Sequence, residues 1–381
     1  MRDGAPTLPM FFSALDSNVL ILMTGRVRAR DFGIEIGQLE TGKLNAITDV
    51  EGVGVGHSTL IKGEDVRTGV TAIVPHQGNP FEEKVTAAVD LFNAYGKSTG
   101  IPQIMFEGVM EVPLMLTETL NTWRVADAVV DYMKEGYGAP PPSLNVVVGE
   151  TNGGYLTDNF GRHIGKKHVF EAIDAARSPK GRGPVPEGNV GGGTPMTGYG
   201  FKGGIGTSSR KFANFTVGVL VQLNCGSKDD LRIDGVPVGR EVELPTVPGR
   251  SPGNSIMMIL ATDLKLESRQ LWKVAKRVAF GLARTGTIGG NSSGDFTIAF
   301  TTGKKTVDEL REMIPAEARA FSGEGYLSFA YRAAVEATEE AIVNALFKAE
   351  TMTGRDGNTR HGLPYDQVES IFEKYGRTLS K

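Results

Sequence analysis

The second half of the chain alternates between apolar and amphipathic segments, and this alternation limits the folds that it can adopt. Residues 215–224 (FTVGVLVQLN) and 254–263 (NSIMMILATD) are apolar runs of strand length, and residues 295–302 (DFTIAFTT) predict another strand. Residues 267–286 predict an amphipathic helix, with one apolar face made of Leu271, Val274, Ala275, Val278 and Leu282. A second helix is expected over residues 329–350. Strands and helices grouped in this way favour an α+β fold with layers around stacked sheets over strict βαβ winding.

The first half of the chain predicts further strands and one helix. Residues 144–150 (LNVVVGE) indicate a buried strand, and residues 121–136 predict a helix that stops at Gly136. Residues 187–210 are rich in glycine and predict a loop. Three more segments, each bounded by turn residues, predict strands: 52–61, 69–75 and 84–96. The sequence contains no internal repeat, low-complexity tract or clear interdomain linker.

Composition argues against several classes of protein. The chain has 41 lysines and arginines against 44 aspartates and glutamates, a balance that favours neither nucleic acid nor an anionic membrane as a partner. Its single cysteine, Cys225, cannot form a disulfide within the chain, and its five histidines show no ligand spacing, so no metal or cofactor is predicted. Residues 10–23 are moderately apolar, but Asp16 and Asn18 interrupt them and they are too short to span a bilayer. We expect a cytoplasmic protein.

Two glycine-containing motifs suggest nucleotide binding, and both are incomplete. Residues 95–99 (YGKST) match the end of a phosphate loop, but the first glycine should lie five residues before Gly96, where the chain has Leu91. Residues 198–203 (GYGFKG) have dinucleotide-binding spacing, but Pro195 precedes them and no helix is expected after them. A non-catalytic nucleotide-binding protein is therefore a disfavoured alternative.

A third motif, in the loop before the apolar run 254–263, suggests a serine nucleophile. Residues 249–253 (GRSPG) match the GxSxG elbow around Ser251, in which the N–H of the next residue serves as an oxyanion donor and a helix follows. The next residue here is Pro252, which has no N–H, and a strand is expected to follow. We therefore interpret Ser251 as a loop serine.

Ser255 lies where the same apolar run begins, and it has neither an elbow nor an obvious histidine partner. Cleavage of the Asn254–Ser255 peptide bond would give this serine a free α-amine, whose ordinary pKa near neutral pH suits a general base. The hydroxyl could make that cut itself by an N-to-O acyl shift, if the proline- and glycine-rich loop strains the bond. On local sequence alone, the alternative is a serine that simply begins a strand.

A series of ordered sequence blocks runs from about Arg28 to Leu363. It includes RARDFGI, NAITDVEGVGVGHSTL, ETNGGYL, EGNVGGGT, FKGGIGTSSR, SIMMILATD and GLARTGTIGGNSSGDFTIAFTT. In these blocks the chain resembles the L-aminopeptidase/D-esterase-amidases and β-peptidyl aminopeptidases, a family of self-cleaving N-terminal-serine hydrolases. The resemblance implies an αββα sandwich like that of N-terminal-nucleophile hydrolases, in one domain over residues 28–381, with residues 1–27 as an extension. It also implies cleavage into residues 1–254 and 255–381, no cofactor, and a homo-oligomer of processed heterodimers.

The resemblance also assigns roles to individual residues. It makes Ser255 the nucleophile, Ser293 and Asp295 its supporting serine and acid, Asn224 the oxyanion-hole asparagine and Tyr155 the active-site tyrosine. Some relatives have glutamate at the acid, so the shorter Asp295 departs from their pattern. Without the family, Asn224 could equally be a turn asparagine, Ser293 and Asp295 a polar strand entry, and Tyr155 a structural tyrosine.

The activity implied is release of an N-terminal L-, D- or β-amino acid from a short peptide, amide or ester. Such an enzyme must recognise the free ammonium group of its substrate. Glu150, at the end of the strand predicted over residues 144–150, is our candidate for that contact. The alternative on the same scaffold is an endo-acting oligoamide hydrolase, which would cleave blocked oligomers internally.

Overall fold

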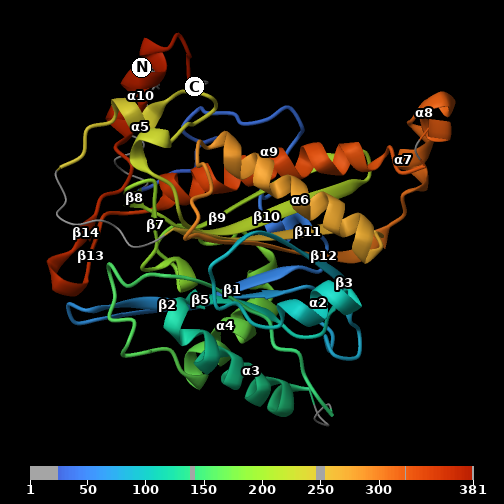
Figure 1. Cartoon of the computed structure of the whole chain (residues 1–381), viewed down its shortest axis with the longest axis horizontal. Helices are drawn as coiled ribbons and strands as arrows, with labels where there is room; N and C mark the ends of the chain where they lie inside the picture. The colour runs from blue at the N-terminus through green and yellow to red at the C-terminus, as the bar shows by residue number, and fades with distance from the viewer. Residues whose placement is uncertain (1–24, 138–141, 246–253, 322, 380–381) are drawn as a thin grey trace, which may run out of the picture.

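The structure is a computed structural model that describes residues 25–137, 142–245, 254–321 and 323–379. Most of the predicted extension 1–27, and Ser251 with its loop, lie outside the described residues. Four layers follow one another: two helices, a six-stranded sheet, a four-stranded sheet and two more helices (Figure 1). This is the αββα sandwich that the sequence predicted. Within the described ranges, none of the helices combines the length and the apolar character that a membrane span needs.

The four-stranded sheet has the order β1-β2-β5-β6, with α3 (Thr122–Gly136) and α4 (Lys166–Arg177) on its outer face (Figure 1). Its first three strands pair antiparallel, whereas β6 runs parallel to β5. The strands span Gly54–Lys62 (β1), Val66–Val74 (β2), Leu114–Glu118 (β5) and Val148–Thr151 (β6). β5 ends at Glu118, and β6 ends one residue after Glu150.

The six-stranded sheet has the order β4-β3-β12-β11-β10-β9, with α6 (Ser268–Arg284) and α9 (Leu327–Lys348) on its outer face. All its pairs are antiparallel except β11 with β12, which are joined through α6. The strands span Val109–Met110 (β4), Val85–Ala94 (β3), Gly294–Lys305 (β12), Ser255–Leu264 (β11), Phe215–Asn224 (β10) and Gly204–Phe212 (β9). The second half thus contains one βαβ unit inside an otherwise antiparallel sheet.

Shorter elements surround this sandwich. The remaining helices are α2 (Ile101–Glu107), α5 (Val238–Glu241), α7 (Asp308–Glu312), α8 (Ala316–Phe321) and α10 (Tyr365–Lys374). Two small hairpins pair β7 (Thr197–Gly198) with β8 (Phe201–Lys202), and β13 (Met352–Thr353) with β14 (Thr359–Arg360). Single 3₁₀ turns lie at Ile47–Asp49, Thr119–Asn121, Lys180–Arg182, Gly191–Gly193, Lys228–Asp230 and Arg355–Gly357.

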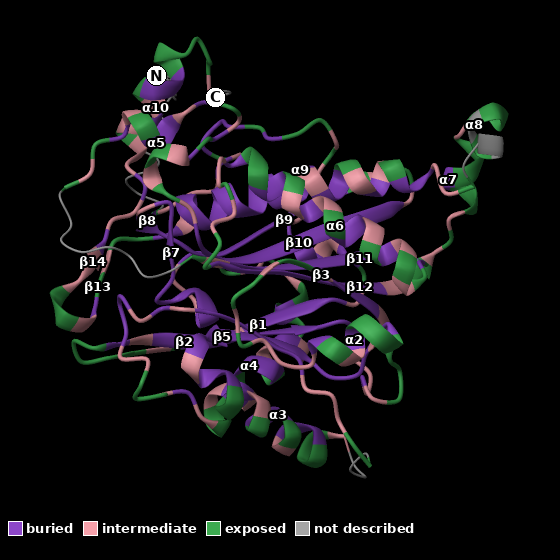
Figure 2. Cartoon of the chain, viewed as in Figure 1, coloured by how far each residue is buried: buried purple, intermediate pink, exposed green. Residues whose placement is uncertain are grey.

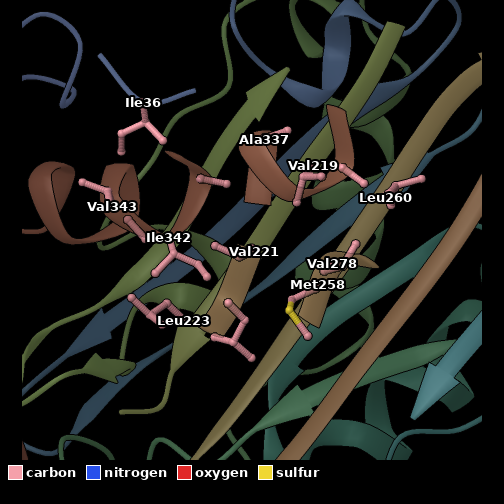
Figure 3. Close-up of a cluster of buried hydrophobic side chains, with 14 of the residues drawn as sticks. Ile36, Val219, Val221, Leu223, Met258, Leu260, Val278, Ala337, Ile342 and Val343 are labelled. Carbon is pink, nitrogen blue, oxygen red and sulfur yellow. The ribbon is translucent and has the colours of Figure 1, made fainter. Parts of the chain in front are cut away.

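The central strands β10 and β11 are buried along almost their whole length (Figure 2). Their side chains divide between two cores, one on each face of the sheet. Val219, Val221 and Leu223 of β10 point toward the helices with Met258 and Leu260 of β11, where they meet α6 and α9 (Figure 3). Successive strand residues point to opposite faces. The intervening residues therefore fill the second core, between the sheets: Leu220, Met257, Ile259 and Ala261.

Most predicted elements are confirmed, and two predictions are wrong. The segment 187–210, expected as a loop, contains the whole hairpin β7–β8 and most of β9. Its glycines let β9 approach α9 closely: a Cβ on Gly206 would lie 2.0 Å from the Ala341 carbonyl oxygen. The strand expected from residue 144 begins only at Val148, because the Asn145 N–H donates to the Glu111 carboxylate instead of to a neighbouring strand.

A buried ion pair joins β9 to α9. The Arg210 guanidinium and the Glu340 carboxylate are both fully buried, and their closest nitrogen and oxygen lie 2.6 Å apart. Arg30 adds a second bond to Glu340 at 3.0 Å, and Asn45 a third. A buried charge that loses its partner keeps its desolvation penalty, so this pair ties the helix layer to the edge of the sheet.

We expect Glu340→Ala to lower the free energy of unfolding by about 3–5 kcal/mol, because it leaves the Arg210 charge buried without its main partner. Denaturant unfolding followed by circular dichroism measures this. The exposed acid Glu373 provides the control, since Glu373→Ala should change stability by less than about 0.5 kcal/mol. A loss below about 1 kcal/mol for Glu340→Ala would show that the pair does not hold these layers together.

Candidate active site

Strand register brings three predicted site segments to one edge of the six-stranded sheet, the edge where β11 and β12 begin and β10 ends. Asn224, the last residue of β10, lies directly opposite Ser255, the first residue of β11. On the other side of β11, Ser255 is paired with Gly294, the first residue of β12, and Ile256 is paired with Asp295. Residues that are 31 and 39 positions apart in sequence therefore meet around Ser255.

Ser255 is half-buried, whereas the rest of β11 is fully buried. The Gly294 N–H donates to two acceptors, each at 3.2 Å: the Ser255 hydroxyl and the carbonyl oxygen of Asn254. One backbone donor thus contacts both the hydroxyl that would attack and the carbonyl of the bond that would break. Such a donor can stabilise negative charge that develops on the Asn254 oxygen.

Ser293 and Asp295 are brought together beside this edge. The Ser293 hydroxyl donates to Asp295 Oδ1 at 2.6 Å, and both residues are buried. Burial raises the pKa of Asp295, while hydrogen bonds from Ser293, Asn93 and the backbone of Ile256 lower it. The serine and acid that the sequence predicted as a pair therefore contact each other, one residue on either side of Gly294.

Asn224 is buried, and its side-chain amide is oriented by neighbours on both sides. Its Oδ1 accepts from the Thr197 N–H at 2.9 Å, and its Nδ2 donates to the Asn152 carbonyl oxygen at 3.0 Å. A side-chain amide nitrogen carries two hydrogens, and the contacts made by the described residues use one of them. The Asn224 amide is thus fixed beside Ser255, and its second Nδ2 hydrogen can donate to an oxyanion.

Glu150 reaches this region from the other sheet. Its Oε1 accepts from the Lys97 N–H at 2.7 Å. Gly96 lies between Glu150 and β12: a Cβ added to Gly96 would lie 3.2 Å from Glu150 Oε1, and one added to Gly294 would lie 3.3 Å from the Gly96 Cα. Residue 96 therefore lies between Glu150 and the start of β12, where the absence of a side chain permits the close approach.

Glu118, which the sequence analysis did not single out, lies next to Glu150 at the ends of the parallel strands β5 and β6. It is fully buried, and its Oε1 has no hydrogen-bond partner among the described residues. Burial, with a smaller contribution from the charge of Glu150, raises the pKa of Glu118 to about 8. Glu118 is therefore mostly neutral at pH 7 and places no second full charge beside Glu150. An acid directly after the apolar run LMLT was the only sequence signal for it.

Tyr155 is buried, and its ring packs under the Arg360 guanidinium, 3.7 Å from the ring centroid. Its carbonyl oxygen accepts from the Asn358 side chain at 3.0 Å. Both partners come from the segment that carries β14, so residues 353–364 contribute to the surroundings of this tyrosine. Its catalytic role stays a prediction.

Two other sequence interpretations have a structural outcome. The glycines of GYGFKG form the hairpin β7–β8 and β9 follows them, which confirms the expectation that no helix comes after this motif. Among the described residues, no group of three or more histidines, cysteines, aspartates and glutamates could hold a metal ion. Lys202 in the same hairpin was not predicted: it is fully buried, donates to the Gly193 and Gly203 carbonyls, and burial lowers its pKa to about 7.

The known proteins that this chain resembles are peptidases and aminopeptidases. Residues 45–360 match the model of peptidase family S58. The chain is 40% identical over 377 residues to a β-peptidyl aminopeptidase of Sphingosinicella microcystinivorans, covering 92% of this chain and 93% of that one. It superimposes on a β-aminopeptidase of a Burkholderia species with a TM-score of 0.81 and 36% identity, covering 92% of this chain and 100% of that one.

A second solved structure identifies the fold. It is the L-aminopeptidase D-Ala-esterase/amidase of Ochrobactrum anthropi, described as a prototype of the serine aminopeptidases and a variant of the Ntn hydrolase fold. The TM-score is 0.78 and the identity 38%, over 93% of this chain and 99% of that one. The chain is thus a hydrolase with an N-terminal-nucleophile fold. It belongs to peptidase family S58, and its relatives support a serine aminopeptidase or amidase function.

We expect Glu118→Gln to stabilise the protein increasingly as pH rises from 5 to 8. The pKa of Glu118 is about 8 in the folded chain and near 4.5 when unfolded, so unfolding releases a proton across this window. Each pH unit then costs the wild type on the order of 1.4 kcal/mol, a cost that glutamine lacks. Denaturant unfolding of both proteins between pH 5 and 9 measures the difference.

The exposed Glu312 supplies the matched control, because Glu312→Gln should leave the pH dependence of stability unchanged. A difference between Glu118→Gln and wild type that stays constant from pH 5 to 9 would contradict a neutral, buried Glu118.

Proposed function

We propose that the chain is a self-processing serine aminopeptidase or amidase that cuts its own Asn254–Ser255 bond and then uses Ser255 as an N-terminal nucleophile. One observation carries this proposal. The Ser255 hydroxyl and the Asn254 carbonyl share the Gly294 N–H as a hydrogen-bond donor, opposite the fixed amide of Asn224. The bond to the Asn254 carbonyl belongs to the parallel ladder of β11 and β12, whereas the bond to the Ser255 hydroxyl is additional to that ladder and supports a role beyond beginning a strand.

Self-cleavage begins with attack of Ser255 Oγ on the carbonyl carbon of Asn254. The hydroxyl loses its proton as the carbon–oxygen bond forms, and the negative charge develops on the Asn254 oxygen, where the Gly294 N–H stabilises it. Collapse breaks the peptide bond, the Ser255 nitrogen takes up the proton that the hydroxyl released, and an ester links Asn254 to Ser255 Oγ. Water then hydrolyses this ester, leaving a carboxylate on Asn254 and a free amine on Ser255.

Turnover repeats the chemistry on an external carbonyl. The Ser255 amine acts as general base while Ser255 Oγ attacks the substrate, and the second Nδ2 hydrogen of Asn224 stabilises the oxyanion. The protonated amine then donates to the leaving amine, and water hydrolyses the acyl-serine ester. Ser293 and Asp295, joined by a 2.6 Å hydrogen bond, hold the amine and hydroxyl in orientation.

The substrate is a short peptide, amide or ester with a free N-terminus. The Glu150 carboxylate, anchored by the Lys97 N–H, would bind the substrate ammonium, and the neutral Glu118 beside it leaves one dominant negative charge there. The names of the relatives cover β-peptides, L-amino acids and D-Ala esters or amides. An endo-acting oligoamide hydrolase stays the alternative, and the carboxylate at this position favours the aminopeptidase.

Sheet pairing supports association of the two fragments after the cut. Residues 255–381 contribute β11 and β12 to the middle of the six-stranded sheet, between β10 and β3 of residues 1–254. Separation would break two strand pairings and open both cores. The homo-oligomeric assembly of such heterodimers, and the cytoplasmic location, stay predictions from the sequence.

Intact mass spectrometry of the freshly purified protein tests the proposal. We expect wild type to give two masses, for residues ending at Asn254 and residues 255–381, and Ser255→Ala to give one uncut chain, because it lacks the attacking hydroxyl. Ser251→Ala is the matched control and should be cut like wild type. A wild type that stays as one chain, or a cut that persists in Ser255→Ala, would contradict the proposal.

A further inference from the structure

Asn93, near the end of β3, lies opposite the acid of the site because β3 contains a bulge. The register pairs Asp295 of β12 with Asn93, but it pairs the next residue, Phe296, with Leu91. Phe92 is thus an extra residue on β3 without a partner on β12. Bulges bend a strand and re-aim its side chains. Without this one, strand alternation would place a different residue beside Asp295.

The Asn93 amide contacts the carboxylate oxygen that Ser293 leaves open. Its Nδ2 donates to Asp295 Oδ2 at 3.0 Å, while the Ser293 hydroxyl donates to Oδ1 at 2.6 Å. The two donors come from different segments and hold opposite oxygens, so together they fix the rotation of the carboxylate. Both bonds also favour its charged form against the effect of burial.

The same nitrogen lies within hydrogen-bond distance of the carbonyl oxygens of Gly289 and Gly290, at 3.1 and 3.3 Å. These residues precede Ser293 in the turn that leads into β12. Asn93 therefore links the Asp295 carboxylate to the turn that contains Ser293.

We propose that Asn93 is a positioning residue of the active site, which fixes the Asp295 carboxylate so that Ser293 and the Ser255 amine meet it in one orientation. This inference rests on the proposed function. Asn93 is half-buried, and its neighbours Leu91 and Phe92 are 38% and 48% exposed. Its loss should therefore affect the site more than the fold.

Steady-state kinetics on an aminoacyl p-nitroanilide, with self-processing followed by intact mass, tests the inference. We expect Asn93→Ala to fold with an unchanged thermal midpoint and to lose at least tenfold in kcat with KM within about twofold, because Asn93 contacts the acid and not the substrate. Asn189→Ala is the matched control: its amide donates to the Glu350 carbonyl outside the site, and its kcat should stay within twofold of wild type. A kcat within twofold for Asn93→Ala overturns the inference.

The isosteric Asn93→Asp variant gives a signature that a structural role would not produce. Above neutral pH the introduced carboxylate repels Asp295, whereas at lower pH one shared proton restores a donor between the two oxygens. Its kcat relative to wild type should therefore rise as pH falls from 9 to 6. Among the described residues, the buried Cys225 thiol also acts on Asp295, and burial keeps this thiol neutral by raising its pKa well above the ordinary value. The Ser255 amine titrates in both proteins, and an introduced carboxylate that raised the amine's pKa would lower the ratio as pH falls, which is the opposite of the expected change.

If Asn93→Ala does not fold, the test is how the kcat of Asn93→Asp relative to wild type changes with pH. A ratio that does not change between pH 9 and 6 overturns the inference. Failure of both variants to fold would assign Asn93 to fold stability and overturn it too. Wild type in the same assays distinguishes failure of the proposed function from failure of the role proposed for Asn93. An uncut, inactive wild type contradicts the proposed function, whereas an active wild type with fully active Asn93 variants contradicts only the role of Asn93.

Discussion

The parallel pairing of β11 with β12 is the constraint on which the site depends. Parallel strands start at the same edge of a sheet, so the first residues of both strands, Ser255 and Gly294, are neighbours. The connection through α6 makes this pairing possible in a sheet that is otherwise antiparallel. If β12 ran the other way, Asp295 would lie at the far end of β11, about 30 Å from Ser255 at 3.3 Å per residue. The antiparallel β10 then delivers its last residue, Asn224, to the same edge.

Burial confines the polar chemistry to this edge. The middle of β10 and β11 is covered by helices on one face and by the second sheet on the other, so those positions are apolar. The second sheet also ends its strands near this edge, which brings Glu118 and Glu150 to the site. Desolvation keeps the Glu118 carboxyl neutral, so in the proposed function Glu150 is the carboxylate that would bind the substrate ammonium.

The helices and strands that could be predicted from sequence were those whose apolar residues have a clear spacing. The runs 215–224 and 254–263 could be predicted as buried strands, and the amphipathic run 267–286 as a helix, because their apolar spacing is local information. β9 could not, since its glycines serve close packing on α9, which sequence does not display. Among the site residues, Ser255, Ser293, Asp295 and Asn224 were predicted through family motifs. Asn93 was missed because it lies 202 residues from Asp295 and reaches it only through a bulge.

In the proposed mechanism, the freed Ser255 at the start of β11 forms a covalent bond with the substrate. Rapid quenching of the processed enzyme with an ester substrate, followed by mass mapping, measures this directly. We predict an acyl adduct on the 255–381 chain, located by fragmentation at the Ser255 oxygen, that appears before steady-state turnover and disappears as substrate is consumed. Turnover with no adduct under these conditions, or an adduct on any other residue, would contradict the account.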